Sequence, residues 1–158
     1  MTIILDMGGV LMQHNMPECI RRFCEMLGEE GMANTLGMKV NAEGLPDSLM
    51  EKFECGLVTT EEFVHTILAN AKEGTTEQQI IDAWNTMHAG IPLERIKQIK
   101  RWKKLGHHLL LLSNNNALHW EDIHAHYDMS IFDQCFASHL VHSHKPNKPI
   151  YEHIQKYL

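Results

Sequence analysis

The chain has 158 residues, a length that favours a single domain with a small insertion. Its content of 44% hydrophobic and 22% charged residues is ordinary for a globular protein. The formal net charge of −6 offers no basic face for nucleic-acid phosphates, and the longest apolar run, residues 109–112, is too short to span a bilayer. We therefore expect neither a nucleic acid nor a membrane as a partner.

The N-terminus and the cysteines bear on the cellular compartment. The chain enters an apolar run at Ile3 without the basic and apolar regions of a signal peptide. The cysteines show no C-x-x-C spacing, which favours reduced thiols over disulfides or a zinc site. They are Cys19, Cys24, Cys55 and Cys135. These features predict a cytoplasmic protein.

The first predicted element is a strand that ends in a carboxylate. Residues 3–5 are an apolar run typical of a buried parallel strand, and Asp6 follows directly. Gly8 and Gly9 then allow a sharp turn and a close approach of a ligand to the backbone. Because open α/β sheets bind ligands at the carboxyl ends of their strands, Asp6 is the first candidate functional residue.

A helical block is predicted between residues 17 and 88, with about four helices and no convincing strand. The first helix runs from Pro17 to Gly28, a looser stretch extends to residue 45, and Pro46 begins the second helix. Capping boxes begin the other two helices. Their residue pairs are Thr59 with Glu62, and Thr75 with Gln78.

From residue 91 onward, helical and strand patterns alternate. We predict a helix over 93–102, a strand over 109–112, a helix over 118–126 and a third strand within 131–138. A last helix contains Ile150 to Tyr157. Such alternation indicates a parallel sheet with right-handed crossovers.

The predicted fold class is therefore α/β, with a small Rossmann-like parallel sheet and an inserted helical cap. Residues 1–14 and 89–158 form the predicted core, and residues 15–88 form the predicted cap. Because the block follows the first strand, we expect it over the C-terminal edge of that strand, where it could close like a lid.

Polar side chains follow each of the predicted strands. Asp6 follows the first, Ser113 and Asn114 follow the second, and Lys145 follows the third after a short loop. Since the carboxyl ends of parallel strands share one edge, we expect these groups to converge. Together they suit a phosphoryl group: a carboxylate can attack phosphorus, a hydroxyl and amides can bind oxygens, and a lysine can offset charge.

With these motifs in this order, the chain resembles the haloacid dehalogenase (HAD) superfamily of hydrolases over essentially its whole length. Residues 5–11 look like its first motif, Ser113-Asn114 like its second, and Lys145-Pro146 with Ile150-Tyr151 downstream like its third. The helical insertion is similar to the small cap of subfamily I, and residues 56–63 contain a short sequence motif that is common in such caps. The motif sequences most resemble those of bacterial sugar-phosphate phosphatases and of the phosphatase domain of soluble epoxide hydrolases.

The resemblance implies an enzyme, a Mg²⁺-dependent phosphatase that cleaves a small phosphorylated metabolite through an aspartyl-phosphate. Asp6 would be the nucleophile and a magnesium ligand, and the backbone carbonyl of Gly8 would be a second metal contact. Lys145 would be the second catalytic residue and would steady Asp6 and the phosphate. The residues expected to bind the phosphoryl group are Ser113, Asn114, Gly8 and Gly9. The cap would select the substrate.

One departure from the family pattern concerns the proton donor. Most phosphatases of the family carry a second aspartate two residues after the nucleophile, where this chain has Gly8. Sugar-phosphate-like members with glycine there keep phosphatase activity open. Dehalogenases of the family also lack that aspartate, so a metal-independent 2-haloacid dehalogenase remains an alternative.

A second departure concerns the fourth motif, an acidic pair that would complete the magnesium site. It does not occur before Leu158, and we expect the chain to be a fragment in which the C-terminal part of the core is missing. The Asp6 strand would then lack one neighbour, which would favour self-association. An inactive fragment or a binding protein with the same fold is the third alternative.

Histidine-rich sequence near the C-terminus requires its own interpretation. His124 and His126 form one H-x-H pair, His142 and His144 form another, and His139 lies nearby. We expect surface histidines on loops and helix ends. A transition-metal site is the weaker hypothesis, because no E-x-x-H or three-ligand spacing accompanies these pairs.

Overall fold

Short apolar runs form a parallel sheet at the centre of the fold. The computed structural model describes residues 1–37 and 48–158. Its three strands are β1 (Thr2–Leu5), β2 (His108–Ser113) and β3 (Gln134–Ala137), in the order β1-β2-β3. Both strand pairs are parallel, which confirms the predicted α/β sheet.

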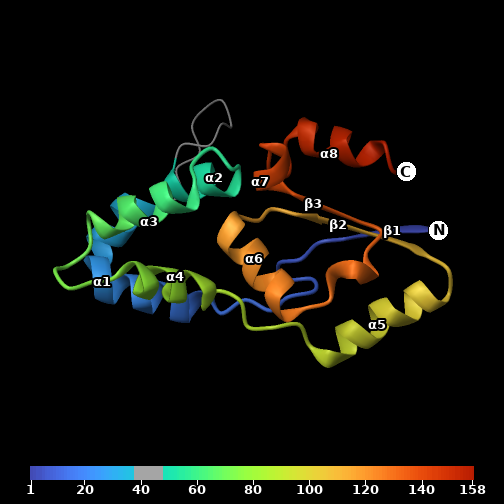
Figure 1. The fold of residues 1–158 in the computed structure, drawn as a ribbon, viewed down its shortest axis with the longest axis horizontal. Coiled ribbons are helices and arrows are strands. Elements are labelled where there is room, and N and C mark those ends of the chain that lie inside the picture. The colour runs from blue at the N-terminus through green and yellow to red at the C-terminus, as the bar shows by residue number, and fades with distance from the viewer. Residues whose placement is uncertain (38–47) are drawn as a thin grey trace.

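Helices cover both faces of this sheet (Figure 1). Successive side chains of β2 point to opposite faces, so its run of leucines is buried on both sides. Leu109 and Leu111 pack with residues of the helices on one face, whereas Leu110 and Leu112 pack on the other face against Ile150. The helices that accompany the sheet are α5 (Leu93–Lys104), α6 (Ala117–His126), α7 (Ser138–Val141) and α8 (Lys148–Gln155). A 3-10 turn, η1 (Met129–Ile131), lies between α6 and β3.

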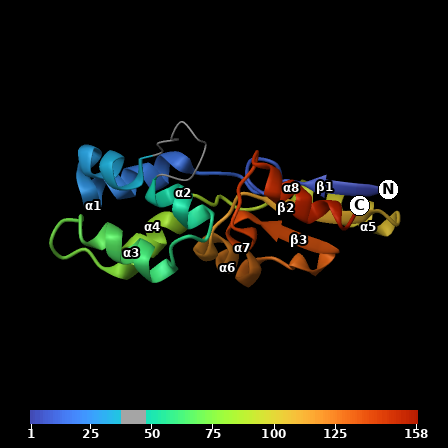
Figure 2. The same ribbon diagram turned by 90° about the horizontal axis from the view of Figure 1, so that it is seen from above.

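The remaining helices form a bundle beyond the C-terminal ends of the strands (Figures 1 and 2). This helical bundle consists of α1 (Met16–Leu36), α2 (Leu49–Glu54), α3 (Thr60–Leu68) and α4 (Glu77–Asn85). Its interior is aromatic: the Phe53 and Phe63 rings stack with centroids 4.1 Å apart, and Trp84 meets Phe63 edge-on at 4.9 Å. All three side chains are at most 1% exposed.

Two boundaries in the bundle differ from the sequence prediction. The chain remains helical from Gly28 to Leu36, so the predicted loose stretch is wrong there; Gly28, with φ of 71°, only interrupts α1. The capping box placed at Thr75 lies one residue later, at Thr76, because the Thr75 hydroxyl donates to the Lys72 carbonyl and closes the preceding turn. The predicted box at Thr59 is confirmed. The helix start at Pro46 lies outside the described residues.

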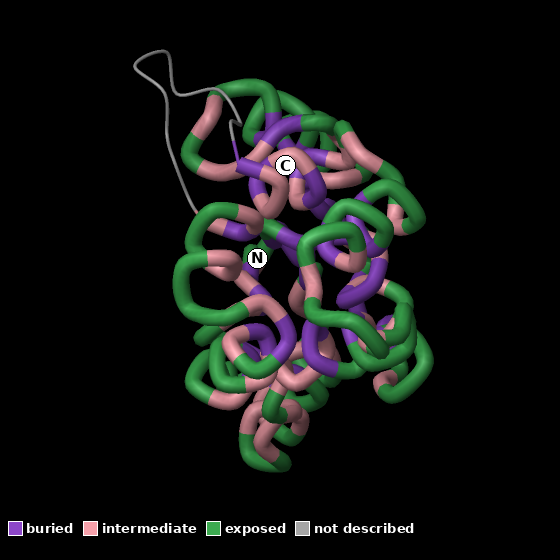
Figure 3. The backbone as a smooth tube through the Cα atoms, turned by 90° about the vertical axis from the view of Figure 1, so that its left-hand side faces the viewer, coloured by how far each residue is buried: buried purple, intermediate pink, exposed green. Residues whose placement is uncertain are grey.

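One edge of the sheet is open along β1. Among the described residues, β1 pairs only with β2, from Thr2 opposite His108 to Leu5 opposite Leu111, and Ile4 remains 43% exposed. Elsewhere in the fold, the buried segments gather in the interior, as Figure 3 shows. Self-association through this edge stays a prediction. Within residues 1–37 and 48–158, no helix combines the length and the apolar character needed to cross a membrane.

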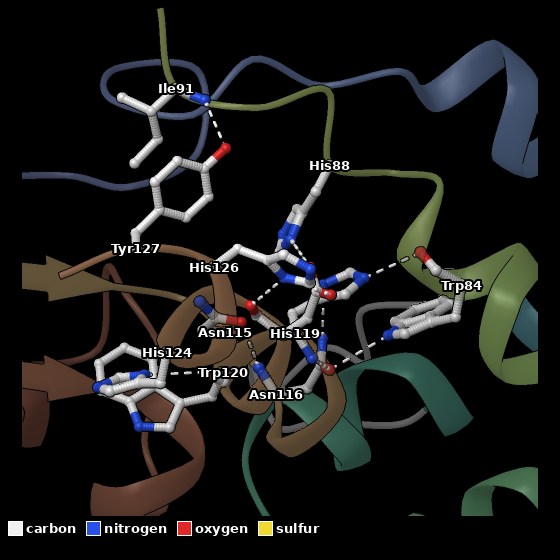
Figure 4. Close-up of polar contacts among 11 residues, drawn as sticks. Trp84, His88, Ile91, Asn115, Asn116, His119, Trp120, His124, His126 and Tyr127 are labelled. Carbon is white, nitrogen blue, oxygen red and sulfur yellow. Dashed lines mark hydrogen bonds and ion pairs between the residues drawn. The ribbon is translucent and has the colours of Figure 1, made fainter. Parts of the chain in front are cut away.

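A buried polar network joins the helical bundle to α6 (Figure 4). The Trp84 indole N–H donates to Asn116 Oδ1 over 3.1 Å, and the His119 ring stacks on Trp84 with centroids 5.1 Å apart. His119 Nε2 lies 2.9 Å from the Trp84 carbonyl oxygen, so it donates there, while Nδ1 accepts from the Asn116 amide. Burial, with a smaller contribution from the neighbouring His88, lowers the pKa of His119 to about 3.

A second set of contacts joins the end of α2 to α7 and the loop after it. The Ser138 hydroxyl donates to the Glu54 carbonyl over 2.5 Å, and the Cys55 sulfur lies 3.1 Å from His144 Nδ1. The prediction that the C-terminal histidines lie on the surface is wrong for His139 and His144, which are half-buried near this junction. The short helix α7, which brings them there, was not predicted.

Replacing Gly56 by alanine should weaken this junction. A Cβ on Gly56 would lie 2.3 Å from the His139 carbonyl oxygen, and the φ of 65° is itself strained for alanine. We expect the free energy of unfolding to fall by about 2 kcal/mol or more in urea denaturation. Gly106→Ala is the matched control, because Gly106 has a φ of 79° but open space around it. Equal losses in the two variants would contradict the steric contribution.

Replacing His119 by glutamine should flatten the pH dependence of stability. The unfolded histidine takes up a proton near pH 6.5, whereas the folded one does so only near its pKa of about 3, so stability is lost as pH falls between these values. Between pH 7 and pH 5 the wild type should lose on the order of 2 kcal/mol more than the variant. Urea denaturation at both pH values measures this, with His153→Gln as an exposed control. Parallel pH profiles of wild type and variant would disprove it.

Candidate active site

The polar groups that follow the strands meet at the C-terminal edge of the sheet. Lys145 Nζ lies 2.6 Å from Asp6 Oδ2 and donates a second hydrogen bond, over 3.0 Å, to the Leu112 carbonyl oxygen of β2. The ammonium group therefore bridges the ends of β1 and β2. The side chains of Lys145 and Asp6 are 20% and 40% exposed, so the ion pair is accessible from one side.

Asp6 is held in place by its own turn. Its Oδ1 accepts a hydrogen bond from the Met7 N–H over 2.8 Å, while Oδ2 faces Lys145. The following loop folds back, because both the Leu11 and Met12 N–H groups donate to the Met7 carbonyl. This arrangement leaves the carboxylate at the strand end, where an incoming electrophile can reach it.

Ser113 and Asn114 sit at the end of β2 beside the ion pair. Ser113 is 1% exposed and its hydroxyl donates to the Asn114 carbonyl over 3.1 Å. The Asn114 side chain pairs with the backbone of Lys145: Nδ2 donates to its carbonyl over 3.0 Å, and Oδ1 accepts from its N–H over 2.7 Å. These two hydrogen bonds from Asn114 thus fix the loop that carries Lys145.

These residues line one cavity of about 330 Å³ between the sheet edge and the helical bundle. Of the site residues predicted from sequence, Asp6, Gly8, Ser113, Asn114 and Lys145 all line it. Gly9, with φ of 71°, forms the turn but is not among the lining residues. The structure therefore brings together residues from the first, second and third motif regions.

Other lining residues were missed from sequence. They are Met7, His14, Glu54, Met87, His88, Asn115, Asn116 and His119. His14 and His88 lie where the chain enters and leaves the helical bundle, and no spacing pattern singles them out. For Glu54, the sequence did offer an indication, because this residue lies two positions before Gly56, where the motif that resembles a HAD cap begins.

Glu54, at the end of α2, is a second acidic residue in the lining of the cavity. Burial, together with the charge of the neighbouring Glu51, raises the pKa of Glu54 to about 7. Near neutral pH this carboxyl is therefore partly protonated, and it can donate as well as accept a hydrogen bond. The bundle thus contributes a titratable residue to the cavity that Asp6 also lines.

A hard cation could be held by oxygen atoms at this edge. Mg²⁺ commonly uses one or two carboxylates together with carbonyls, waters and substrate phosphate. The Asp6 carboxylate is partly exposed, and the Gly8 carbonyl accepts no hydrogen bond among the described residues. These two oxygen donors fit Mg²⁺, although no group of three or more His, Cys, Asp or Glu side chains in residues 1–37 and 48–158 could hold a metal ion.

Comparison with known proteins gives matches among solved structures. No family model and no curated protein matches the chain. A HAD family enzyme from Bacteroides thetaiotaomicron, in a magnesium complex, is 22% identical with a TM-score of 0.83, covering 99% of this chain and 76% of that one. The same enzyme with magnesium and inorganic phosphate is 24% identical with a TM-score of 0.79, covering 98% and 76%.

A third structure comes from another organism. A protein from Porphyromonas gingivalis described as a predicted HAD-like family hydrolase is 28% identical, with a TM-score of 0.79, and the alignment covers 98% of this chain and 75% of that one. These similarities extend through the sheet and the helical bundle together. The chain therefore has the fold of the haloacid dehalogenase superfamily, which confirms the resemblance of its motifs.

Proposed function

We propose that this protein is a Mg²⁺-dependent hydrolase that cleaves a small phosphomonoester with Asp6 as the nucleophile. The observation that carries the proposal is the 2.6 Å contact between Asp6 Oδ2 and Lys145 Nζ at a cavity also lined by Ser113. A carboxylate paired with an ammonium beside a hydroxyl is suited to attack on phosphorus. One enzyme of the same fold, from Bacteroides thetaiotaomicron, forms a complex with magnesium and inorganic phosphate, which supports the proposed chemistry but names no substrate.

In the proposed reaction, a carboxylate oxygen of Asp6 forms a bond to phosphorus while the bond to the leaving-group oxygen breaks. Lys145 keeps its ammonium group beside the Asp6 carboxylate and offsets negative charge on the phosphoryl oxygens. The Ser113 hydroxyl supplies a hydrogen bond to the same group. Water then cleaves the aspartyl-phosphate and returns the free carboxylate. Mg²⁺, held by Asp6 and the Gly8 carbonyl, would supply further neutralisation of the phosphate charge.

The cavity also limits the substrate. Its volume of about 330 Å³ is at the small end of the range for ligand sites. Glu54 and Met87 contribute to its wall from the helical-bundle side. We infer that the substrate is a small phosphorylated metabolite whose non-phosphate part meets the bundle, so that the bundle sets the selectivity.

A metal-independent dehalogenase is the second candidate, because Gly8 provides no carboxyl group near the nucleophile. In that reaction, Asp6 would form a bond to carbon as the halide leaves, and water would then cleave the resulting ester. The Lys145–Asp6 pair is compatible with this chemistry as well. The two candidates differ in substrate and in their need for a divalent cation.

Asp6→Asn should abolish phosphatase activity. The amide is a poor nucleophile, so we expect turnover of 4-nitrophenyl phosphate with Mg²⁺ to fall by about three orders of magnitude or more. Asp82→Asn, on the exposed surface of α4, is the matched control and should keep wild-type activity. Turnover that survives in the Asp6 variant at near the wild-type rate would rule out this nucleophile.

Magnesium dependence should separate the two candidate functions. We expect EDTA to abolish phosphatase turnover and added Mg²⁺ to restore it. Mg²⁺ with beryllium fluoride should also raise the thermal midpoint of the wild type but not of Asp6→Asn, because ligands of the folded state stabilise it. Halide release from a 2-haloacid that is unaffected by EDTA, with no phosphatase activity, would favour the dehalogenase instead.

A further inference from the structure

The space beside Gly8 is filled by the side chain of His14. A Cβ added to Gly8 would lie 2.7 Å from Cε1 and 2.8 Å from Nε2 of His14. The third nearest heavy atom, at 4.0 Å, also belongs to the same ring. The φ of Gly8 is not among the positive values of this chain, so its backbone would accept other residues. The imidazole therefore occupies the volume that a side chain at position 8 would take.

The backbone holds His14 firmly at this place. The flanking Gln13 N–H donates to the Gly90 carbonyl over 2.9 Å, and the Asn15 N–H donates to the Met87 carbonyl over 2.8 Å. The segments that enter and leave the helical bundle are thus paired on both sides of His14. Such pairing fixes the backbone that carries the His14 side chain before any substrate binds.

Two other groups around the cavity that carry a proton, His119 and Lys145, are already engaged. Both ring nitrogens of His119 are hydrogen-bonded, and Lys145 is paired with Asp6. His88 Nδ1 is buried and has no hydrogen-bond partner in the described part of the chain. No hydrogen bond among the described residues uses the His14 ring, which lines the cavity and is exposed.

We propose that His14 is a catalytic residue that donates the proton to the leaving group, in the place of the side chain that Gly8 lacks. This rests on the proposed phosphatase function. As the bond between Asp6 and phosphorus forms and the bond to the leaving oxygen breaks, the proton of the imidazolium passes to that oxygen. The neutral imidazole then accepts a proton from the water that attacks the aspartyl-phosphate, and release of phosphate restores both side chains.

The nature of the leaving group provides the test. An alkoxide is strongly basic and needs a proton as it departs, whereas 4-nitrophenolate is stable without one. Removal of a proton donor should therefore slow hydrolysis of an alkyl phosphate far more than that of 4-nitrophenyl phosphate. Removal of a group with a purely structural role should slow both alike.

The experiment compares kcat/KM for 2-phenylethyl phosphate and 4-nitrophenyl phosphate, with Mg²⁺, in wild type and variants. We expect His14→Ala to lower the first value by about 10²- to 10³-fold and the second by less than about 10-fold. His14→Gln, which keeps volume over Gly8, should show the same selective loss. His153→Ala, exposed on α8, should show none.

A second pair of variants tests the shared space. Gly8→Asp alone meets the His14 ring, whereas Gly8→Asp with His14→Ala places a carboxyl group in the vacated volume. The double variant should hydrolyse 2-phenylethyl phosphate at least about 10-fold faster than His14→Ala, a gain within the range of proton-transfer catalysis. A double variant no faster than His14→Ala would count against the proposal.

The outcomes separate this inference from the proposed function. Asp6→Asn should remove activity toward both substrates. An active wild type in which His14→Ala loses activity equally for both, or for neither, would overturn the role of His14 and leave the phosphatase intact. A selective loss in Glu54→Gln instead would assign proton donation to the bundle carboxyl. A wild type inactive on both substrates would overturn both proposals.

Discussion

The ion pair between Asp6 and Lys145 is the interaction on which the site depends. It joins the first strand to a loop near the end of the chain, and it forms only because β1 and β2 lie side by side and end at one edge. The Leu112 carbonyl and the Asn114 side chain hold the lysine from the second strand. A charged pair in a partly buried position is stable only with such additional hydrogen bonds, and here they come from the sheet itself.

The helical bundle completes the cavity because it is fastened to the core in two places. On one side Trp84, His119 and Asn116 form a buried network, and on the other the end of α2 packs against α7. The network keeps His119 neutral, since its burial strongly disfavours the charged ring. Between these two attachments, Glu54 and Met87 face the sheet edge that carries Asp6.

The strands and most helices were predictable from sequence, because their signals are local. A run of four leucines is buried on both faces of β2, and Thr59 with Glu62 caps α3 as expected. The errors were also local: the Thr75 hydroxyl served the preceding turn, and Gly28 interrupted α1 without ending it. The half-burial of His139 and His144 was missed, because it depends on how the bundle docks.

The sequence by itself determined which groups stand at the strand ends, since strand period and parallel order place Asp6, Ser113 and Lys145 on one edge. It also showed that position 8 has no side chain. Only the tertiary structure decided what fills that space. His14 reaches Gly8 because the residues on either side of it pair with residues 87–90, which follow the helical bundle in sequence. Contacts between segments so distant in sequence depend on tertiary packing, so local sequence patterns do not predict them.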